Sequence, residues 1–270
     1  MNPARGPHCS RRLVLLLSPP AFVMPRLDQA LVERGLCESR EKAKRAIMAG
    51  RVSINQQHAR KPSDPVQPRD RIALQSGEKY VSRGGHKLEH ALNHFHLNVE
   101  GLTAVDLGAS TGGFTDCLLQ HGAKEIFAVD VGRGQLAWEL RRHPRVIVME
   151  RTNARDLAPS KFPRPFRPVD LVVIDCSFIS LTKIIPAAAG LLRRAGRIVA
   201  LIKPQFEAGK PEADQGGGVI SDPRIHQRVL RELESFVHAT GQLRWLGATE
   251  SPLLGPAGNK EFLALLEKMG

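Results

Sequence analysis

The chain has 270 residues, 42% of them hydrophobic, which is enough to bury a sizeable core in one large or two unequal domains. Lysine and arginine number 39 against 27 aspartate and glutamate residues, and the formal net charge is +12. A basic excess of this size indicates a polyanionic partner, with nucleic acid ahead of an anionic membrane, unless the protein is basic throughout.

The cysteines and the hydropathy exclude several classes of protein. The four cysteines are far apart and form neither a CxxC pair nor a spacing typical of zinc ligands; they are Cys9, Cys37, Cys117 and Cys176. We therefore expect no metal and a reduced, cytoplasmic protein. No apolar run approaches the roughly 18 residues that a membrane helix needs, so no membrane span or membrane partner is expected.

The first 23 residues resemble a signal peptide only superficially. The apolar stretch Leu13 to Leu17 is shorter than the usual hydrophobic region, and two prolines follow shortly after it. We expect residues 1–23 to be a disordered or mis-annotated extension, with the natural start at Met24.

Residues 24–75 predict a small basic domain of the α+β class. A short helix begins near Leu27, and Ser39 offers an N-cap for a second, basic helix that ends near Gly50. The strand-like segments RVSIN and RIAL follow, separated by the proline-rich loop KPSDPVQPRD. Between residues 26 and 72, 11 lysine or arginine residues outnumber 6 acidic residues, a net charge of +5, so the charge is partly concentrated here.

The rest of the chain predicts a larger second domain. The stretch QSGEKYVSRGG is polar, glycine-rich and without periodicity, so residues 76–82 are expected to be a linker and residues 83–270 to form the domain that follows. Apolar runs alternate there with helical stretches, which predicts an α/β fold with a mostly parallel, doubly wound, Rossmann-like sheet. The strand candidates are LTAVDLG, EIFAVDV, RVIVME, PVDLVVIDCSF and GRIVALIK, and a late helix precedes strands near LRWLGA and EFLALLE.

The motif VDLGASTGGF follows the first of these strands and is the expected cofactor turn. Its glycines allow a tight turn and close approach to a nucleotide-like ligand, although a turn without a ligand can show the same spacing. Asp106 would repel the pyrophosphate of a dinucleotide, which disfavours a dehydrogenase, and would attract the amino group and sulfonium of S-adenosylmethionine. We expect Asp130 to bind the ribose hydroxyls and Asn153 to read the adenine. The expected cofactor-binding residues are Asp106, Gly108, Ala109, Ser110, Thr111, Gly112, Gly113, Phe114, Asp130, Asn153 and Asp175.

Five motifs carry a more specific resemblance: SRGGHKL, DLGASTGGF, DCSFISL, LIKPQFEAGK and GPAGNKEF. In this order they resemble the TlyA (hemolysin A) family of ribosomal RNA 2′-O-methyltransferases, over essentially all of residues 24–270. The resemblance implies an S-four-like RNA-binding domain at residues 24–75, followed by an FtsJ-like methyltransferase domain that uses S-adenosyl-L-methionine. It also implies ribosomal RNA or a ribosomal subunit as partner, with cytidine as the target nucleoside.

The same resemblance implies a catalytic tetrad. In FtsJ-like enzymes a Lys-Asp-Lys-Glu set occupies four such motifs, which assigns these roles to Lys87, Asp175, Lys203 and Glu261. A ribose 2′-hydroxyl is a poor nucleophile until a base takes its proton, and desolvation or a nearby cation can prepare a lysine for this task. We expect Lys203 to be the base, Lys87 and Glu261 to position the ribose and hold the lysine, and Asp175 to contact the cofactor and align the reactants. A surface or ion-pair role is the ordinary alternative for any one of them.

The expected RNA-binding residues lie mostly near the second helix of the small domain, where a solvated helix face is the alternative; they are Arg26, Arg40, Lys42, Lys44, Arg45, Arg51 and Arg83. Two other functions stay open. A non-catalytic RNA-binding ribosome-assembly factor is disfavoured by the complete tetrad, and a membrane-active hemolysin would need an amphipathic or spanning segment. His86, His90 and His94 share a helical spacing, but no aspartate or cysteine completes a metal site.

Overall fold

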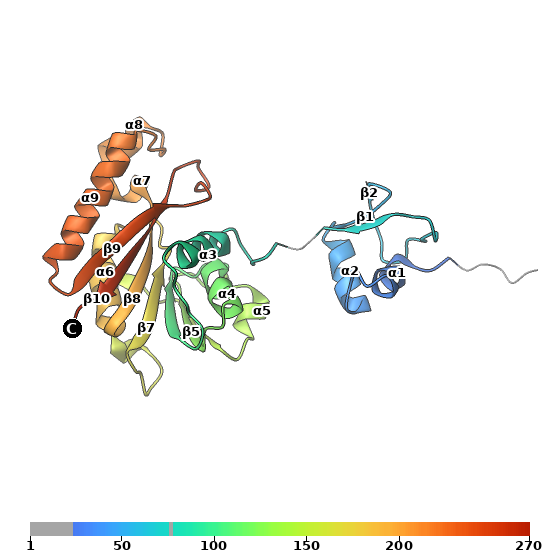
Figure 1. Cartoon of the computed structure of the whole chain (residues 1–270), viewed down its shortest axis with the longest axis horizontal. Helices are drawn as coiled ribbons and strands as arrows, with labels where there is room; N and C mark the ends of the chain where they lie inside the picture. The colour runs from blue at the N-terminus through green and yellow to red at the C-terminus, as the bar shows by residue number, and fades with distance from the viewer. Residues whose placement is uncertain (1–23, 76–77) are drawn as a thin grey trace, which may run out of the picture. The chain divides into compact units, whose positions relative to one another are not determined.

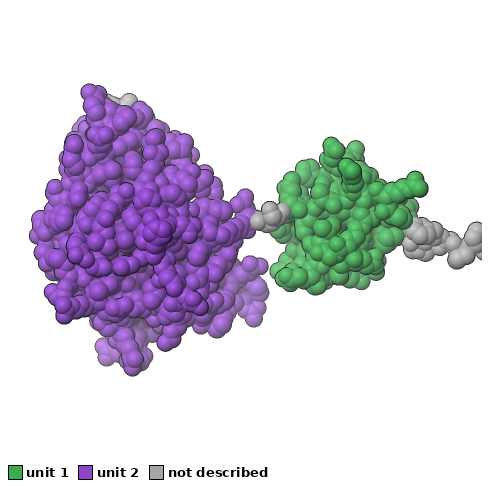
Figure 2. Space-filling view, in the orientation of Figure 1, with its two compact units in different colours: residues 1–77 green, residues 78–270 purple. Residues whose placement is uncertain are grey.

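The computed structural model describes residues 24–75 and 78–270, and the chain divides into two compact units, Met1–Gly77 and Glu78–Gly270 (Figure 2). The predictions for residues 1–23 and for residues 76–77 of the expected linker lie outside the described residues. The second unit begins before the expected residue 83, because Tyr80 is only 1% exposed and packs in the core of that unit.

Two helices open the first unit, as predicted. These are α1 (Leu27–Glu33) and α2 (Arg40–Met48), and the Ser39 side chain caps α2 by accepting a hydrogen bond from the Lys42 amide. Buried aliphatic residues of both helices, such as Leu31 and Ile47, form one apolar cluster with the first strand. The small domain therefore has its own core.

A three-stranded antiparallel sheet completes the first unit, with β1 (Val52–Ile54) between β2 (Gln57–His58) and β3 (Ile72–Leu74). Strand β2 was not predicted. Its two residues are exposed, and it follows a turn in which Asn55 and Gln56 have positive φ angles. A strand this short and exposed carries no alternation of apolar residues that a sequence could reveal.

The second unit is built on a seven-stranded sheet in the order β6–β5–β4–β7–β8–β10–β9 (Figure 1). Strands β4 to β8 are parallel, and β10 runs antiparallel to both β8 and β9. The mostly parallel α/β sheet is confirmed, and each strand lies on an apolar run that predicted it. Their bounds are β4 (Thr103–Leu107), β5 (Glu125–Val129), β6 (Val146–Met149), β7 (Val169–Ile174), β8 (Leu192–Ile202), β9 (Leu243–Glu250) and β10 (Phe262–Lys268).

Helices cover both faces of this sheet (Figure 1). In β4, the neighbouring residues Ala104 and Val105 belong to opposite apolar cores, as expected of a strand that is buried on both faces. One face carries α3 (Gly84–His94), α4 (Gly113–Gln120) and α5 (Trp138–Arg141), and the other carries α6 (Ile185–Leu191) and α9 (Pro223–Ala239). The shorter elements are α7 (Pro204–Glu207), α8 (Lys210–Gln215), and the 3-10 turns η1 (Ala154–Asp156), η2 (Pro159–Lys161) and η3 (Leu181–Lys183). In the described parts of the chain, none of the helices has both the length and the apolar character needed to cross a bilayer.

The order of the strands reverses beside β4. The chain runs outward from β4 to β5 and β6, and then returns to place β7 on the other side of β4. In open α/β sheets, the ligand crevice lies beyond the carboxyl ends of the strands at such a reversal. Here these ends lead into Gly108, which follows β4, and Asp175, which follows β7.

Tight packing at the start of α3 generates a first prediction. A Cβ atom at Gly85 would lie 2.2 Å from the Cγ atom of the buried Tyr80 ring. We expect Gly85→Ala to lower the free energy of unfolding by about 1–3 kcal/mol, because the core must shift to accept the methyl group. Gly190→Ala in α6 is the matched control, since nothing lies within 4 Å of its Cβ position.

The control should leave stability unchanged or raise it by up to about 1 kcal/mol, as alanine favours a helix over glycine. Urea denaturation followed by circular dichroism measures both variants. Equal stability of the two variants would contradict the packing at Gly85.

Candidate active site

All four residues of the expected tetrad line one cavity of about 620 Å³ in the second unit. Lys87 comes from α3, Asp175 follows β7, and Lys203 follows β8. Glu261 precedes β10, which is antiparallel, so it reaches the same edge of the sheet. The fold thus joins four segments that are distant in the sequence.

The tetrad forms two ion pairs. The Lys87 Nζ atom lies 2.5 Å from the Glu261 Oε2 atom, and their side chains are 8% and 1% exposed. The Lys203 Nζ atom lies 2.6 Å from the Asp175 Oδ1 atom, with side chains 10% and 24% exposed. Lys203 also donates a hydrogen bond to the Ser177 hydroxyl at 2.8 Å. Charges buried to this degree need partners, because an isolated ion would lose its hydration without compensation.

The pairing differs from the sequence-based expectation. That expectation allowed a nearby cation to prepare Lys203, whereas the contacts of its Nζ atom are with a carboxylate and a hydroxyl. Glu261, expected to help hold Lys203, contacts Lys87 instead. Four residues on separate segments can pair in more than one way, and only the packed structure distinguishes these ways.

The turn after β4 forms an adjoining wall. Gly108 has a φ angle of +86°, and a Cβ atom there would lie 2.8 Å from the carbonyl oxygen of Asp175. Only glycine permits this approach. The expected turn residues on the wall are Gly108, Ala109, Ser110, Thr111, Gly113 and Phe114. Gly112, also expected at the cofactor, is not on this wall, and a Cβ atom there would lie 2.2 Å from the Cδ1 atom of Leu140 in α5.

A second cavity of about 350 Å³ adjoins the first. Asp130 and Asn153, expected at the ribose and the adenine, both line it. The Asp130 carboxylate accepts hydrogen bonds from the amides of Ser110 at 2.8 Å and Gly132 at 2.6 Å. The bond from Ser110 joins the end of β5 to the turn after β4, so Asp130 shapes the cavity as well as lining it. The two cavities share Gly108, Ser110, Asp175, Ser177 and Phe178.

Asp106, which was expected to contact the cofactor, lies in β4 and is on the wall of neither cavity. The residue is fully buried, and its Oδ2 atom accepts a hydrogen bond from the Thr115 hydroxyl at 2.6 Å. Its Oδ1 atom has no partner among the described residues. Burial raises the pKa of Asp106 to about 7. The hydrogen bond from Thr115 lowers this pKa, and the negative charge of Asp175 raises it further. Through its hydrogen bond with Thr115, Asp106 therefore holds the first turn of α4 against β4.

Several wall residues escaped the sequence analysis. These residues are Ser177, Phe178, Gln205, Phe206 and Asn259. Each lies within three residues of a tetrad member, and this closeness in the sequence is the feature that could have predicted them. Phe178 is 90% exposed and has a φ angle of +64°, a conformation that aromatic residues rarely adopt. An exposed ring held in a strained backbone at a cavity mouth is typical of a functional position.

The histidine stripe and the cysteine near the tetrad have other surroundings. Within residues 24–75 and 78–270, no three His, Cys, Asp or Glu side chains are grouped as metal ligands would be. His90 instead contacts Thr249 and stacks on His94. Burial raises the pKa of Cys176 to about 12, so little thiolate exists at neutral pH and the residue serves packing.

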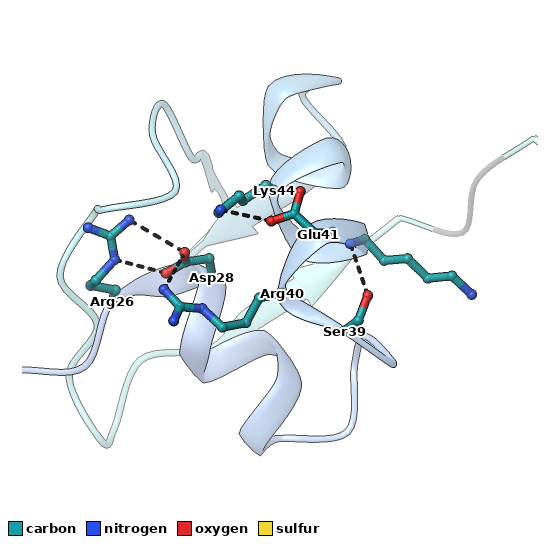
Figure 3. A network of polar contacts seen from close by, with 7 residues as sticks. Arg26, Asp28, Ser39, Arg40, Glu41 and Lys44 are labelled. Atoms are coloured by element: carbon teal, nitrogen blue, oxygen red, sulfur yellow. Dashed lines mark hydrogen bonds and ion pairs between the residues drawn. The ribbon is translucent and has the colours of Figure 1, made fainter.

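A buried carboxylate organises two expected RNA-binding arginines of the first unit. Asp28 is 0% exposed and contacts Arg26 and Arg40, each at 3.0 Å (Figure 3). Burial opposes ionisation, but the hydrogen bonds from these arginines dominate and lower the pKa of Asp28. The arginine side chains stay about half exposed, at 46% and 50%, so the guanidinium groups that Asp28 orients still face solvent.

The other expected RNA-binding residues have different surroundings. Lys42 pairs with Glu38, which precedes α2, and Lys44 pairs with Glu41 at 2.9 Å, so carboxylates in or just before the helix balance part of the charge of α2. Arg83, grouped with them in the sequence, lies in the second unit on the wall of the tetrad cavity. It therefore belongs to the candidate active site.

Comparisons with known proteins agree with this division. The profile of the FtsJ-like methyltransferase family matches residues 80–268, and that of the S4 domain matches residues 25–72. The 16S/23S rRNA (cytidine-2′-O)-methyltransferase TlyA of Mycobacterium tuberculosis is 45% identical over 245 residues, which cover 89% of this chain and 89% of that protein. The chain belongs to the TlyA family of FtsJ-like methyltransferases.

Other similar proteins carry the family's second name. Hemolysin A of Brachyspira hyodysenteriae is 41% identical over 88% of this chain and 98% of that protein. A solved structure from Streptococcus thermophilus, which carries the name of a hemolysin, has 44% identity and a TM-score of 0.68, covering 92% of this chain and 90% of its own. The predicted TlyA membership, with an S4 domain before an FtsJ-like methyltransferase domain, is thus confirmed.

The buried Asp106 predicts a pH dependence of stability for this TlyA-family protein. The pKa of Asp106 rises from its ordinary value of 3.8 to about 7 on folding, so the folded state binds the proton more tightly. The resulting stabilisation is complete below about pH 4 and is lost as the pH rises toward 7. Asp106→Asn removes this titration. The free energy of unfolding of the wild type should therefore fall, relative to the variant, by up to about 1.4 kcal/mol per pH unit across this window.

Urea titrations at pH 4.5, 5.5 and 6.5 would measure this difference. Parallel pH dependences of the two proteins would show that Asp106 ionises equally well in the folded and unfolded states, contrary to the burial described above.

Proposed function

We propose that this protein transfers a methyl group from S-adenosylmethionine to a ribose 2′-hydroxyl of ribosomal RNA, with cytidine as the target nucleoside. The observation that carries the proposal is the single cavity where Lys87, Asp175, Lys203 and Glu261 meet beside the glycine turn. The FtsJ-like family match and the name of the mycobacterial relative, an rRNA (cytidine-2′-O)-methyltransferase, support the same reaction.

The residues around the two adjoining cavities fit S-adenosylmethionine. Asp130 stands at the end of β5, where Rossmann-like sheets bind ribose hydroxyls, and Asn153 lines the same 350 Å³ cavity. Gly108 lies where the cavities share walls, and its missing side chain leaves room for a ligand beside the backbone. The carboxylate of Asp175 faces both cavities and would attract the positive charges of the methionine part. Both volumes suit small-molecule sites, which are about 300–1,000 Å³.

Lys203 would be the base of the reaction. When bound, S-adenosylmethionine supplies an electrophilic methyl group on its sulfonium. Lys203 is the cation of an ion pair with Asp175, so its ammonium would first release a proton; the resulting amine would then take the proton of the 2′-hydroxyl and leave that oxygen as the nucleophile. Asp175 and Ser177 hold the Nζ atom of Lys203 in place through contacts of 2.6 and 2.8 Å.

The Lys87–Glu261 pair would position the ribose. Both side chains are buried and in contact, so their place in the cavity is well defined. An ammonium group has three donors, and Glu261 uses one of them, which leaves donors for oxygen atoms of the substrate. Such alignment matters in a one-step transfer, where orientation supplies a large share of the rate enhancement.

The first unit would hold the RNA. Arg26 and Arg40 present half-exposed guanidinium groups that can bind phosphates in bidentate fashion. A ribosome-assembly factor could use the same surface without catalysis. The complete tetrad favours the enzyme, because RNA binding alone has no use for two buried ion pairs beside a cofactor-sized cavity.

Asp130 allows a direct test of the cofactor assignment. Asp130→Ala should weaken S-adenosylmethionine binding by about 1.5–3 kcal/mol, roughly 10–150-fold in dissociation constant, through loss of charged hydrogen bonds. Glu125→Ala removes a carboxylate from the opposite end of β5 and should leave binding unchanged. Isothermal titration calorimetry measures both, and equal affinity of Asp130→Ala and wild type would remove Asp130 from the cofactor site.

Lys203→Arg and Lys203→Ala test the base. Arginine keeps the positive charge but cannot lose its proton, so both variants should slow single-turnover methyl transfer at least about 100-fold while cofactor binding survives. Lys260→Arg is the control, because Lys260 is half exposed, adjoins Glu261 in the sequence and should retain full activity. Near wild-type transfer by Lys203→Arg would rule out Lys203 as the base.

A further inference from the structure

A third cavity of the second unit, of about 410 Å³, borders the tetrad cavity. Both cavities include the rings of Phe178 and Phe206, whose centroids are 5.1 Å apart. The remaining wall residues of the third cavity are Arg155, Ile179, Ser180 and Lys183. Its volume falls in the range of small-molecule sites, about 300–1,000 Å³, so a nucleotide-sized group fits.

Two side chains on this wall are cationic, Arg155 and Lys183. The Arg155 side chain is 54% exposed and has only a 3.5 Å contact with its neighbour Asp156. The exposed Lys183 ammonium has no ion pair or hydrogen bond with any residue of the described ranges. No carboxylate lines the cavity. On the wall itself an anionic group would therefore meet two cations and no carboxylate, with Asp156 as the nearby acidic partner of Arg155.

The Glu207 carboxylate connects two segments of this wall through hydrogen bonds. It accepts hydrogen bonds from the Ser180 hydroxyl at 2.7 Å and the Leu181 amide at 2.8 Å. Burial raises the pKa of Glu207, and these two bonds oppose the rise. The bonds link α7, which includes Phe206, to the start of η3, which includes Lys183. The aromatic and cationic parts of the wall are thus fixed relative to each other.

We propose that this cavity is a second nucleotide subsite, which takes the RNA residue next to the one whose ribose enters the tetrad cavity. Arg155 and Lys183 would bind its phosphate, and Phe206 and Ile179 would contact its base, since single-stranded RNA offers both chemistries side by side. The shared rings place the two subsites one after the other, as a continuous strand requires. This subsite rests on the proposed function, and it implies that the target is bound as an unstacked, single-stranded segment.

The double variant Arg155→Ala/Lys183→Ala of the full chain tests the subsite. The matched control is Arg167→Ala/Lys124→Ala, which removes the same two residue types from exposed positions before β7 and β5, at the opposite edge of the sheet. The probe is a fluorescein-labelled single-stranded RNA nonamer, with S-adenosylhomocysteine saturating. Fluorescence anisotropy from 50 to 200 mM salt gives the affinity and its salt dependence.

The test variant should bind the nonamer about 10-fold more weakly than the control, and its log–log salt slope should be smaller by about 0.7 for one lost phosphate contact. With ribosomal RNA, its KM should rise while kcat and S-adenosylmethionine affinity stay near wild type. Equal affinity, slope and KM in both variants would overturn the subsite.

The methyl-transfer readout separates this proposal from the proposed function. If the wild type transfers no methyl group but the test variant loses RNA affinity, the result supports the subsite and contradicts the proposed reaction. If the wild type methylates RNA and the test variant does so with unchanged KM, the result supports the proposed reaction and contradicts the subsite.

Discussion

The close approach of β4 and β7 is the constraint on which the rest of the site depends. It needs a residue without a side chain, since a Cβ atom at Gly108 would lie 2.8 Å from the Asp175 carbonyl oxygen. The approach brings the glycine turn and Asp175 to the walls of the same two cavities. Through its 2.6 Å contact, Asp175 then holds Lys203, and one backbone contact thereby connects the cofactor region to the proposed base.

Burial of charge explains how the proposed catalytic groups stay in place. Lys87 and Lys203 are both largely removed from water, and each is accompanied by a carboxylate from a different segment. Removing one partner would leave an uncompensated buried ion, which is strongly unfavourable. The pairs therefore stabilise the junction of α3 with β10 and of β7 with β8, as well as presenting functional groups to the cavity.

The fold followed from the sequence more readily than the site did. Apolar runs predicted the strands of the large sheet because parallel strands buried on both faces must be apolar throughout. Motif resemblance predicted the tetrad, but its pairing depends on packing between distant segments. The surroundings of Asp106 could not be predicted for a related reason: a carboxylate in a glycine motif suggests a ligand contact, whereas its hydrogen bond from Thr115 depends on how α4 packs against β4. Phe178 was not predicted, because its positive φ angle and its exposure cannot be inferred from the residue type.

Mapping of the transferred methyl group tests the central claim most directly. Unmethylated ribosomal RNA would be incubated with the protein and isotopically labelled S-adenosylmethionine, digested, and analysed by mass spectrometry. The arrangement of Lys203 beside a cofactor-sized cavity predicts label on a ribose 2′-oxygen, and the proposed function places that ribose on a cytidine. Label on a base atom, or bound S-adenosylmethionine with no label in the RNA, would contradict it.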